Sequence, residues 1–274
     1  MLRAGVIGVG HLGRFHAQKY TSIDGVQLMG VYDLNSDRAK LVADECKTKA
    51  FDTIAELLKN VDIVSIATPA TVHFESARQA LEAGVHCLIE KPFTRTVDEA
   101  NKLMDIAKCK NVKIQIGHLE RFNTVISEGY SFIKNPRFIE ANRLAPFTAR
   151  STDIDVILDL MIHDIDLILG IMKGSEVTEI DAIGVPVLTD KVDIAHAKLV
   201  FSNGAMANLS ASRISNKVKM IPLEYPDALR KEIESFINAV KTNKEPVVTA
   251  MDAFNALVIA HKIIDKINKR METI

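Results

Sequence analysis

The chain has 274 residues, of which 47% are hydrophobic and 25% charged, and its formal net charge is −1. This length allows one or two domains with buried cores, and the apolar fraction excludes a disordered chain. The balance of 34 basic against 35 acidic residues excludes a nucleic-acid footprint and a polybasic membrane patch. We therefore expect a globular protein whose partners are neither nucleic acids nor membranes.

The three cysteines, Cys46, Cys87 and Cys109, are odd in number and form no CxxC pair. Neither a zinc site nor a disulfide framework is expected, which indicates a reducing compartment. No stretch approaches 18 uncharged apolar residues, and the apolar run from Ala4 to Gly10 is too short for a signal peptide. These features predict a cytoplasmic protein.

Five short apolar runs alternate with amphipathic stretches in the first half of the chain. They cover residues 2–9, 26–32, 62–67, 85–89 and 112–116, and they are rich in Val, Ile and Leu. This alternation is typical of βαβ units on a parallel sheet that is covered on both faces. Thr53 with Glu56, and Thr96 with Glu99, have the spacing of capping boxes at helix starts.

The pattern changes after about Gly117. Strands are expected at 138–144, 177–185, 193–201 and 205–212, and helices at 156–172, 227–241 and 250–270. Ser202-Asn203-Gly204 predicts a tight hairpin turn, and the alternation along 205–212 predicts one covered and one open sheet face. We predict an α/β protein with an N-terminal doubly wound parallel sheet (Rossmann type) and a C-terminal α+β domain on an open, mostly antiparallel sheet.

The expected domains are 1–118 for nucleotide binding and 119–274 for substrate binding and oligomerisation. The C-terminal helix could pack back on the first domain. Lys217-Val218-Lys219-Met220 runs directly into Ile221-Pro222-Leu223-Glu224, where a further strand and connection would be expected. We therefore predict either a short loop or missing residues near Met220.

A glycine-rich loop, Gly8-Val9-Gly10-His11-Leu12-Gly13, directly follows the first predicted strand and opens a helix. Gly8 allows a tight turn, Gly10 lets the backbone approach a pyrophosphate, and Gly13 allows close packing of helix and strand. The amide groups and dipole of the helix start favour the phosphates. The loop therefore predicts a dinucleotide site.

Asp33 ends the second predicted strand, where a carboxylate can accept hydrogen bonds from both hydroxyls of an adenosine ribose. A 2′-phosphate would meet Asp33 as a like charge, so we expect NAD rather than NADP. Two alternatives are a glycine turn without a ligand and a site for S-adenosylmethionine, which uses similar features. The later motifs favour NAD over both.

Glu90-Lys91-Pro92, after Ala83-Gly84-Val85-His86-Cys87-Leu88-Ile89, resembles a motif of the Gfo/Idh/MocA family of oxidoreductases. Further similar segments are Thr68-Pro69 with His73, Gly117 to Phe122, and Asp159-Leu160-Met161-Ile162-His163. The resemblance covers residues 1–123, then 156–170 and the C-terminal helices. It implies a Rossmann domain followed by an open-sheet domain, with Glu-Lys-Pro beside the nicotinamide.

Gly117-His118-Leu119-Glu120-Arg121-Phe122-Asn123, with Asp153-Ile154-Asp155, resembles one subgroup of this family, the UDP-N-acetylglucosamine 3-dehydrogenases. The segment Asp153 to Val156 departs from the glycines of many other members, so their polyol or glucose specificity does not transfer. The resemblance implies an NAD-dependent enzyme that oxidises a ring hydroxyl of a sugar nucleotide to a ketone, here the 3-hydroxyl of UDP-N-acetylglucosamine.

Asp159 and His163 are four residues apart in a helical stretch and therefore share a face. Alcohol oxidation needs a base for the hydroxyl proton, which a histidine oriented by a carboxylate can supply. A lysine can stabilise the developing alkoxide. The resemblance implies that His163 is the principal base, Lys91 the oxygen-binding partner and proton relay, and Asp159 the orienting residue; a helix-stabilising Asp–His pair is the alternative.

The resemblance also implies a wider set of site residues. The cofactor contacts expected are Gly8, Gly10, His11, Leu12, Gly13, Asp33, Thr68, Pro69, His73, Glu90 and Lys91. The substrate contacts expected are Lys91, His118, Arg121, Arg143, Arg150, Asp159 and His163. His118 could equally be a turn residue, and Arg121 could anchor the domain junction by pairing with a carboxylate. Arg143 and Arg150 could clamp a diphosphate or remain solvated.

Three further interpretations stay open. Asp159, His163 and Asp166 could hold a metal, but hydride transfer needs none and one helix would supply every ligand, so no metal is expected. The same chemistry could act on a free sugar, an inositol or an amino sugar. The protein could also be a catalytically silent NAD-binding regulator, although Lys91 and His163 are both present. We expect a homodimer or homotetramer formed through the C-terminal sheet.

Overall fold

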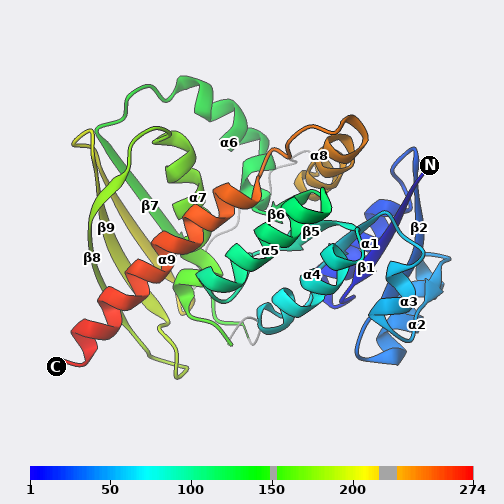
Figure 1. The fold of residues 1–274 in the computed structure, drawn as a ribbon. Coiled ribbons are helices and arrows are strands. Elements are labelled where there is room, and N and C mark those ends of the chain that lie inside the picture. Colours follow the sequence, from blue (N-terminus) through cyan, green and yellow to red (C-terminus); the bar gives the residue numbers. More distant parts are fainter. Residues whose placement is uncertain (149–152, 216–226, 274) are drawn as a thin grey trace. The chain divides into compact units, whose positions relative to one another are not determined.

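The computed structural model describes residues 1–148, 153–215 and 227–273 (Figure 1). The chain forms two compact units. Unit 1 comprises Met1–Leu119 and Asp227–Met251, and unit 2 comprises Glu120–Pro226 and Asp252–Ile274. Segment 227–251 thus belongs to unit 1, whereas the domains expected from the sequence place all of residues 119–274 in the second domain. The junction near Met220 and the residue Arg150 lie outside the described residues.

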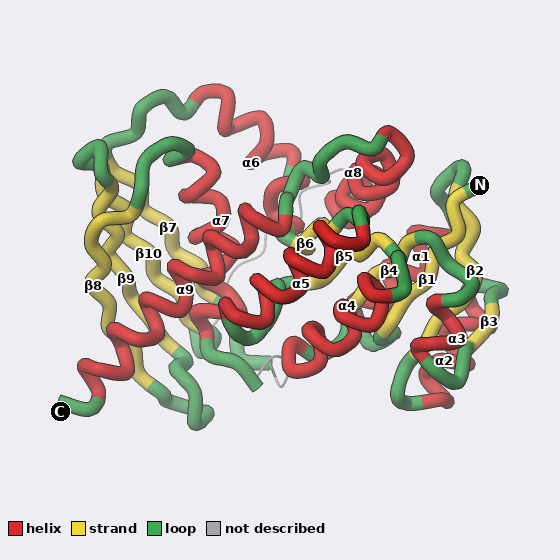
Figure 2. Tube along the Cα trace, viewed as in Figure 1, coloured by secondary structure: helices red, strands yellow, loops and turns green. Residues whose placement is uncertain are grey.

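Unit 1 is built on a six-stranded sheet. Its strands are β1 (Leu2–Ile7), β2 (Val26–Tyr32), β3 (Lys49–Ala50), β4 (Ile63–Ile66), β5 (His86–Glu90) and β6 (Ile114–Gly117). All neighbours are parallel, in the order β3-β2-β1-β4-β5-β6 (Figure 2). This is the strand order of a doubly wound nucleotide-binding sheet, so the predicted class is confirmed. The two-residue strand β3 was not predicted.

Helices follow the strands of unit 1. They are α1 (His11–Tyr20), α2 (Ser36–Glu45), α3 (Ile54–Leu58), η1 (Ala70–Val72), α4 (His73–Glu82), α5 (Val97–Lys110) and α8 (Ala228–Thr242). The predicted capping box of α5 is present: the Glu99 amide donates to Thr96 Oγ1 at 3.2 Å, and the Thr96 amide donates to Glu99 Oε2 at 3.2 Å. Such a cap satisfies two amides that have no partner within the helix.

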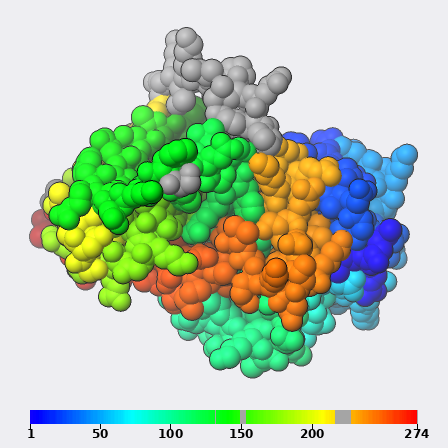
Figure 3. Space-filling model, turned by 90° about the horizontal axis from the view of Figure 1, so that it is seen from above, coloured from blue at the N-terminus to red at the C-terminus, as the bar shows by residue number. Residues whose placement is uncertain are grey.

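Helix α8 joins unit 1 from a distant part of the sequence. Ile233, Phe236 and Ile237 are buried in one cluster with residues of β1 and β2. Asp227 accepts a hydrogen bond from the Arg230 amide at 3.0 Å and forms an ion pair with Lys19 of α1. Figure 3 shows the orange segment that contains α8 lying against the blue N-terminal part of unit 1.

Unit 2 contains a four-stranded sheet. Its strands are β7 (Phe138–Leu144), β8 (Val177–Val185), β9 (Ile194–Phe201) and β10 (Met206–Ser212), in the order β7-β10-β9-β8. Two pairs are antiparallel, while β7 runs parallel to β10. The predicted mostly antiparallel sheet is therefore confirmed. The helical segments are η2 (Leu119–Phe122), α6 (Thr124–Gly129), η3 (Tyr130–Phe132), α7 (Ile162–Ile171) and α9 (Ala250–Met271).

The sheet of unit 2 has one covered and one open face, as its alternation predicts. Ala207, Leu209 and Ala211 are at most 1% exposed, and α7 packs against β7 and β10 on this side. The neighbouring side chain of Met206 points to the other face and is 39% exposed. Among the described helices, none combines the length and apolar character needed to cross a bilayer.

The predicted continuous helix 156–172 is wrong in one respect. Residues Ile157–Met161 form a π-helical turn, and the α-helical part α7 begins only at Ile162. The Asp155 carboxylate accepts a hydrogen bond from the Leu158 amide at 3.3 Å at the start of this turn. Burial raises the pKa of Asp155, although the amides of Leu158 and Ile157 oppose the shift. Short π segments recur at functional sites, and this one contains Asp159.

A buried ion pair supports the segment that leads into this turn. Arg213 Nε donates to Asp193 Oδ1 at 2.7 Å, and Arg213 Nη1 donates to the Ile154 carbonyl at 2.9 Å. Asp193 is fully buried and Arg213 is 3% exposed. Burial alone would raise the pKa of Asp193, but the amides of residues 187–189 and the Arg213 guanidinium hold it well below its usual range.

Arg213→Ala should therefore lower the free energy of unfolding by about 3–5 kcal/mol, because it leaves a buried carboxylate without its counter-charge. The control Arg78→Ala, which breaks exposed pairs with Glu75 and Glu82, should cost about 0–1 kcal/mol. Urea denaturation measures both. The contribution of the Asp193 carboxylate to the free energy of unfolding should be complete above its ordinary pKa of 3.8. It should be lost as pH falls below that value. Equal losses in the two variants would contradict this account.

Candidate active site

The glycine-rich loop lies between β1 and α1, where the chain itself requires two of its glycines. Gly8 has a positive φ of 82°, and a Cβ there would lie 2.8 Å from the Thr68 amide nitrogen. A Cβ on Gly13 would lie 1.8 Å from the Gly8 carbonyl oxygen. Helix α1 can pack this closely on the strand end only because both side chains are absent.

Gly10 differs, because the chain leaves space around it. A Cβ there would meet only Arg38 Nη1, at 4.0 Å. Gly10 is also the N-cap of α1, and no side chain caps this helix in the described structure. An uncapped helix start beside open space fits the pyrophosphate of a dinucleotide, whose oxygens can accept hydrogen bonds from the first amides. His11 and Leu12 follow at this helix start and are exposed.

Asp33 follows β2 and connects it to the glycine-rich loop. Its Oδ2 accepts a hydrogen bond from the Val9 amide at 2.9 Å, and its Oδ1 accepts one from the Asn35 amide at 2.9 Å. Arg38 Nη1 lies 3.5 Å from Oδ2. Because a carboxylate has about four acceptor positions, Asp33 retains capacity for ribose hydroxyls. The loop and Asp33 together fit NAD.

His73 fastens the loops that follow β4 and β5. Its Nδ1 lies 2.8 Å from the Pro92 carbonyl oxygen, and its Nε2 lies 2.8 Å from the Thr68 carbonyl oxygen. Burial lowers the pKa of His73, although the two carbonyl groups oppose the shift. His73 was predicted to contact the cofactor. Its two ring nitrogens instead face backbone carbonyl groups, one of Thr68 and one of Pro92, the residue after Lys91.

Glu90 and Lys91 lie at the end of β5. The Glu90 carboxylate is 3.0 Å from His16 Nε2 of α1. Burial would raise the pKa of Glu90, but the hydrogen bond and charge of His16 and the charge of Lys91 outweigh it and lower the pKa. Lys91 is partly exposed. His118, after β6, is 1% exposed and its backbone amide donates to the Ile116 carbonyl at 2.8 Å.

Asp159 and His163 both belong to unit 2 and are partly exposed. Asp159 lies in the π-helical turn and His163 in the first turn of α7. The Asp159 amide donates to the Asp155 carbonyl at 3.0 Å. Met161, Ile162, Leu167 and Ile168 are all buried. The apolar residues of this segment thus face the core while Asp159 and His163 keep access to solvent.

Two predicted substrate contacts are held by carboxylates within unit 2. Arg121 pairs with the buried Asp166 through two contacts of 2.7 Å. Arg143 pairs with Asp164 at 2.8 and 3.0 Å and with Glu120 at 2.9 Å. Burial opposes the charge of both arginines, but these carboxylates outweigh it and raise each pKa. Any substrate phosphate would have to compete with these forked pairs.

The same pairs bear on the metal alternative. Asp166, which could have joined Asp159 and His163 as a ligand, is engaged by Arg121. Within residues 1–148, 153–215 and 227–273, no three His, Cys, Asp or Glu side chains form a group able to hold a metal ion. Asp164 and Glu120 could not be predicted as partners of Arg143, because no spacing rule connects residues so far apart in the chain.

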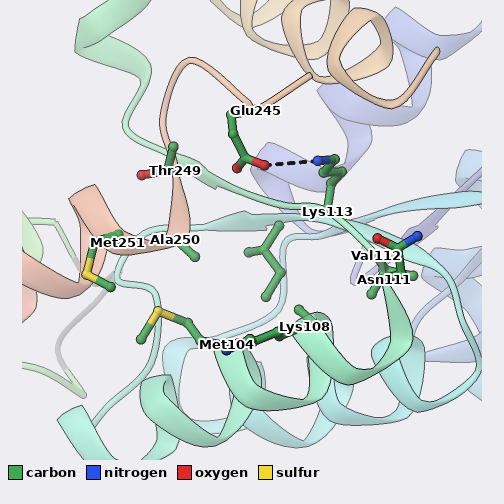
Figure 4. A pocket seen from close by; sticks show the side chains of 11 residues that line it. Met104, Lys108, Asn111, Val112, Lys113, Glu245, Thr249, Ala250 and Met251 are labelled. Atoms are coloured by element: carbon green, nitrogen blue, oxygen red, sulfur yellow. Dashed lines mark hydrogen bonds and ion pairs between the residues drawn. The ribbon is translucent and has the colours of Figure 1, made fainter. Parts of the chain in front are cut away.

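A separate pocket of about 370 Å³ opens in unit 1 between the end of α5 and the start of α9 (Figure 4). Met104, Lys108 and Met251 line it, and Lys113 Nζ pairs with Glu245 Oε1 at 3.0 Å beside it. None of the described predicted site residues lines this pocket. It therefore does not belong to the candidate active site.

Residues 2–118 match an oxidoreductase family with an NAD-binding Rossmann fold, and residues 129–227 match the GFO/IDH/MocA C-terminal domain. The UDP-N-acetylglucosamine 3-dehydrogenase of Acidithiobacillus ferrooxidans is 51% identical over 217 residues, which cover 78% of this chain and 67% of the relative. A solved structure of such an enzyme from that organism has a TM-score of 0.91 at 41% identity and covers 97% of both chains.

A more distant structure shows the fold alone. The scyllo-inositol dehydrogenase of Lactobacillus casei, solved with NAD(H) and scyllo-inositol, has a TM-score of 0.86 at 20% identity and covers 98% of both chains.

Two glycine variants separate the requirements of the fold from those of the cofactor. Gly13→Ala should lower the Tm of the protein without cofactor, because its Cβ meets the Gly8 carbonyl. Gly10→Ala should leave that Tm unchanged and weaken NADH binding about tenfold or more, which is about 1.4 kcal/mol. Thermal unfolding and NADH fluorescence titration measure these effects. Wild-type NADH affinity in Gly10→Ala would contradict the proposed approach of the pyrophosphate.

Proposed function

Because the chain belongs to the Gfo/Idh/MocA family of NAD-binding oxidoreductases, we propose that it oxidises the 3-hydroxyl of UDP-N-acetylglucosamine to a ketone. The observation that carries this proposal is the likeness to UDP-N-acetylglucosamine 3-dehydrogenase, at 41% identity over 97% of both chains. Inositol dehydrogenases share the fold at about half that identity, which favours the sugar nucleotide over a free polyol.

The reaction removes a hydride from the ring carbon and a proton from its hydroxyl, and bound NAD supplies the hydride acceptor. In this proposal Gly8, Gly10 and Gly13 admit the pyrophosphate, and Asp33 accepts hydrogen bonds from the ribose. Thr68, Pro69 and Glu90 shape the strand ends on the nicotinamide side. His73 contributes by fixing the backbone of these loops, because its ring nitrogens face carbonyl oxygens.

We assign the proton chemistry to Lys91, Asp159 and His163. His163 takes the hydroxyl proton, since an imidazole can accept a proton near neutral pH. The Lys91 ammonium group donates to the same oxygen and stabilises the developing alkoxide. Asp159, one turn before His163, orients its ring or contacts a neighbouring hydroxyl.

The arginines of unit 2 have a different proposed role. Arg121 and Arg143 hold Asp166 and Asp164 of α7, the helix that carries His163. We therefore propose that they act first by fixing this helix and contact substrate only at their remaining donors. His118 and Arg150 stay proposed substrate contacts on the strength of the family resemblance.

The open face of the second sheet supports the proposed homo-oligomer. Phe138, Met206 and Val200 form one row across three strands, and Leu144, Ser212 and Ile194 form another. Phe138 is 54% and Leu144 50% exposed, so apolar surface is available for a second copy.

The cysteines are free thiols, which supports the proposed cytoplasmic location.

Purified protein given NAD and UDP-N-acetylglucosamine should form NADH, detected by absorbance, with an aminotransferase present to trap the ketone. His163→Ala should lower kcat about 10²–10⁴-fold, because the base is lost. His86→Asn, outside the proposed site, is the control, since its side-chain oxygen can replace the acceptor that receives the Lys113 amide.

UDP-glucose, N-acetylglucosamine and myo-inositol complete the substrate panel. NADH formation only with a free sugar or inositol would contradict the sugar-nucleotide assignment. NADH binding without any turnover would favour the regulator instead.

Light scattering should give a mass of two or four chains, and Met206→Glu should reduce it by placing a charge in the open apolar row. A monomeric wild-type protein would exclude the proposed oligomer.

A further inference from the structure

A chain of buried polar groups lies behind the end of β5. The Tyr20 hydroxyl is 2.9 Å from Ser65 Oγ, which is 3.0 Å from His16 Nδ1. His16 Nε2 is 3.0 Å from Glu90 Oε1. Tyr20, Ser65 and His16 are at most 1% exposed, so these groups have one another as partners in place of water.

The donors and acceptors of this chain agree with a single direction. In the His16 tautomer whose Nε2–H donates to Glu90, Nδ1 can accept from the Ser65 hydroxyl, and Tyr20 can donate to Ser65 Oγ. In this arrangement every donor of the chain points along it toward the Glu90 carboxylate. The chain thus holds one oxygen of Glu90 through α1 and β4, which flank the nucleotide loop.

Glu232 stands on α8, a helix that packs against β5. It is fully buried, and neither of its carboxyl oxygens has a hydrogen-bond partner among the described residues. The backbone carbonyl of Glu232 accepts a hydrogen bond from Gln115 Nε2 of β6 at 3.0 Å, which fixes its place in the helix. A buried carboxylate without a counter-charge is costly, whereas a neutral carboxylic acid is tolerated.

The charges around Glu232 agree with its neutral form. Burial, and then the negative charge of Glu90, raise the pKa of Glu232 well above its ordinary value. Burial also raises the pKa values of Tyr20 and Cys87, which are the neighbouring groups on α1 and β5, so both stay neutral. Three groups with basic side chains act on Glu90 itself: His16, Lys91 and His73.

Gly117 makes room for Glu90 on the neighbouring strand. The two residues are paired in the β5–β6 register. A Cβ on Gly117 would lie 3.1 Å from Glu90 Oε2 and 3.2 Å from Glu90 Cα. The position of this side chain is therefore set by α1 and β6 together.

We propose that His16, Ser65 and Tyr20 form a buried positioning network that holds the Glu90 carboxylate, that the buried Glu232 keeps its proton beside this network, and that Glu90 thereby fixes the strand end that presents Lys91. The proposal deepens the proposed function and rests on it for the role of Lys91. Lys91 follows Glu90 directly in the chain, so a displaced Glu90 displaces the backbone of Lys91.

Kinetics of Ser65→Ala and Tyr20→Phe test the positioning role. Ser65→Ala should lower kcat about 10- to 100-fold with an unchanged KM for NAD, because a misplaced reacting group costs rate more than binding. Tyr20→Phe, at the far end of the network, should have the smaller effect. The acid limb of the kcat profile should move to higher pH in Ser65→Ala, since a poorly oriented His16 stabilises the Glu90 carboxylate less.

Thr48→Val is the matched control. It removes a part-buried hydroxyl of unit 1 that donates to the Leu28 carbonyl at 2.9 Å, away from Glu90. It should lower Tm without changing kcat or the pH profile. If Ser65→Ala changes Tm alone, as Thr48→Val does, the positioning role is overturned.

Glu232→Gln tests the proton on Glu232 without any enzyme assay. In the wild type, the unfolded chain releases the Glu232 proton above its ordinary pKa of 4.5 while the folded chain keeps it, so stability falls as pH rises. Glu232→Gln has no such proton, and its Tm relative to wild type should therefore increase from pH 5 to pH 8. A Tm difference that does not change with pH would overturn the protonated state of Glu232.

The two readouts separate this inference from the proposed function. If wild-type protein oxidises no sugar nucleotide, the proposed function fails, while the pH-dependent Tm difference still decides whether Glu232 is neutral. If the enzyme is active and Ser65→Ala keeps the wild-type kcat and pH profile, the network fails and the function stands.

Discussion

The contact between His16 and Glu90 joins the two parts of the nucleotide-binding unit that the chemistry needs. His16 lies on the helix that begins at the glycine-rich loop, and Glu90 ends the strand that carries Lys91. A buried carboxylate must have a compensating partner, and this one has it on the helix fixed by the close approach of Gly13 to Gly8. The geometry of the cofactor loop and the place of Lys91 are therefore set by one another.

The same constraint shapes unit 2. Asp166 and Asp164 of α7 are buried and are held by Arg121 and Arg143, while Asp193 is held by Arg213. Arg213 also bonds the Ile154 carbonyl just before the π-helical turn. Forked arginine pairs are directional, so they specify the position of the helix as well as neutralise its charges. The segment with Asp159 and His163 is thus held in place by these ion pairs and by the bond to the Ile154 carbonyl.

Much of this fold could be predicted because its signals are local. The parallel strands are apolar runs, and the glycine-rich loop and capping boxes depend on residues a few positions apart. The π-helical turn could not be predicted, because its apolar spacing is compatible with an α-helix. The parallel pairing of β7 with β10 also lacks a local signal, since about 60 residues separate the two strands.

The candidate site shows the same division. Gly10, Asp33 and Lys91 could be proposed from motifs, whereas the partners of Arg121 and Arg143 required the structure. His16 and Glu232 are separated by almost the whole chain, and Glu232 stands in an ordinary amphipathic helix. Only the placement of α8 in unit 1 brings its buried carboxyl toward Glu90.

If the chain oxidises the sugar nucleotide at C3, a hydride passes from that carbon to NAD. UDP-N-acetylglucosamine deuterated at C3 tests it directly, with mass spectrometry of the reduced cofactor. NADH should carry the deuterium, and the rate should fall relative to unlabelled substrate where hydride transfer limits it. NADH without deuterium from this substrate would contradict oxidation at C3.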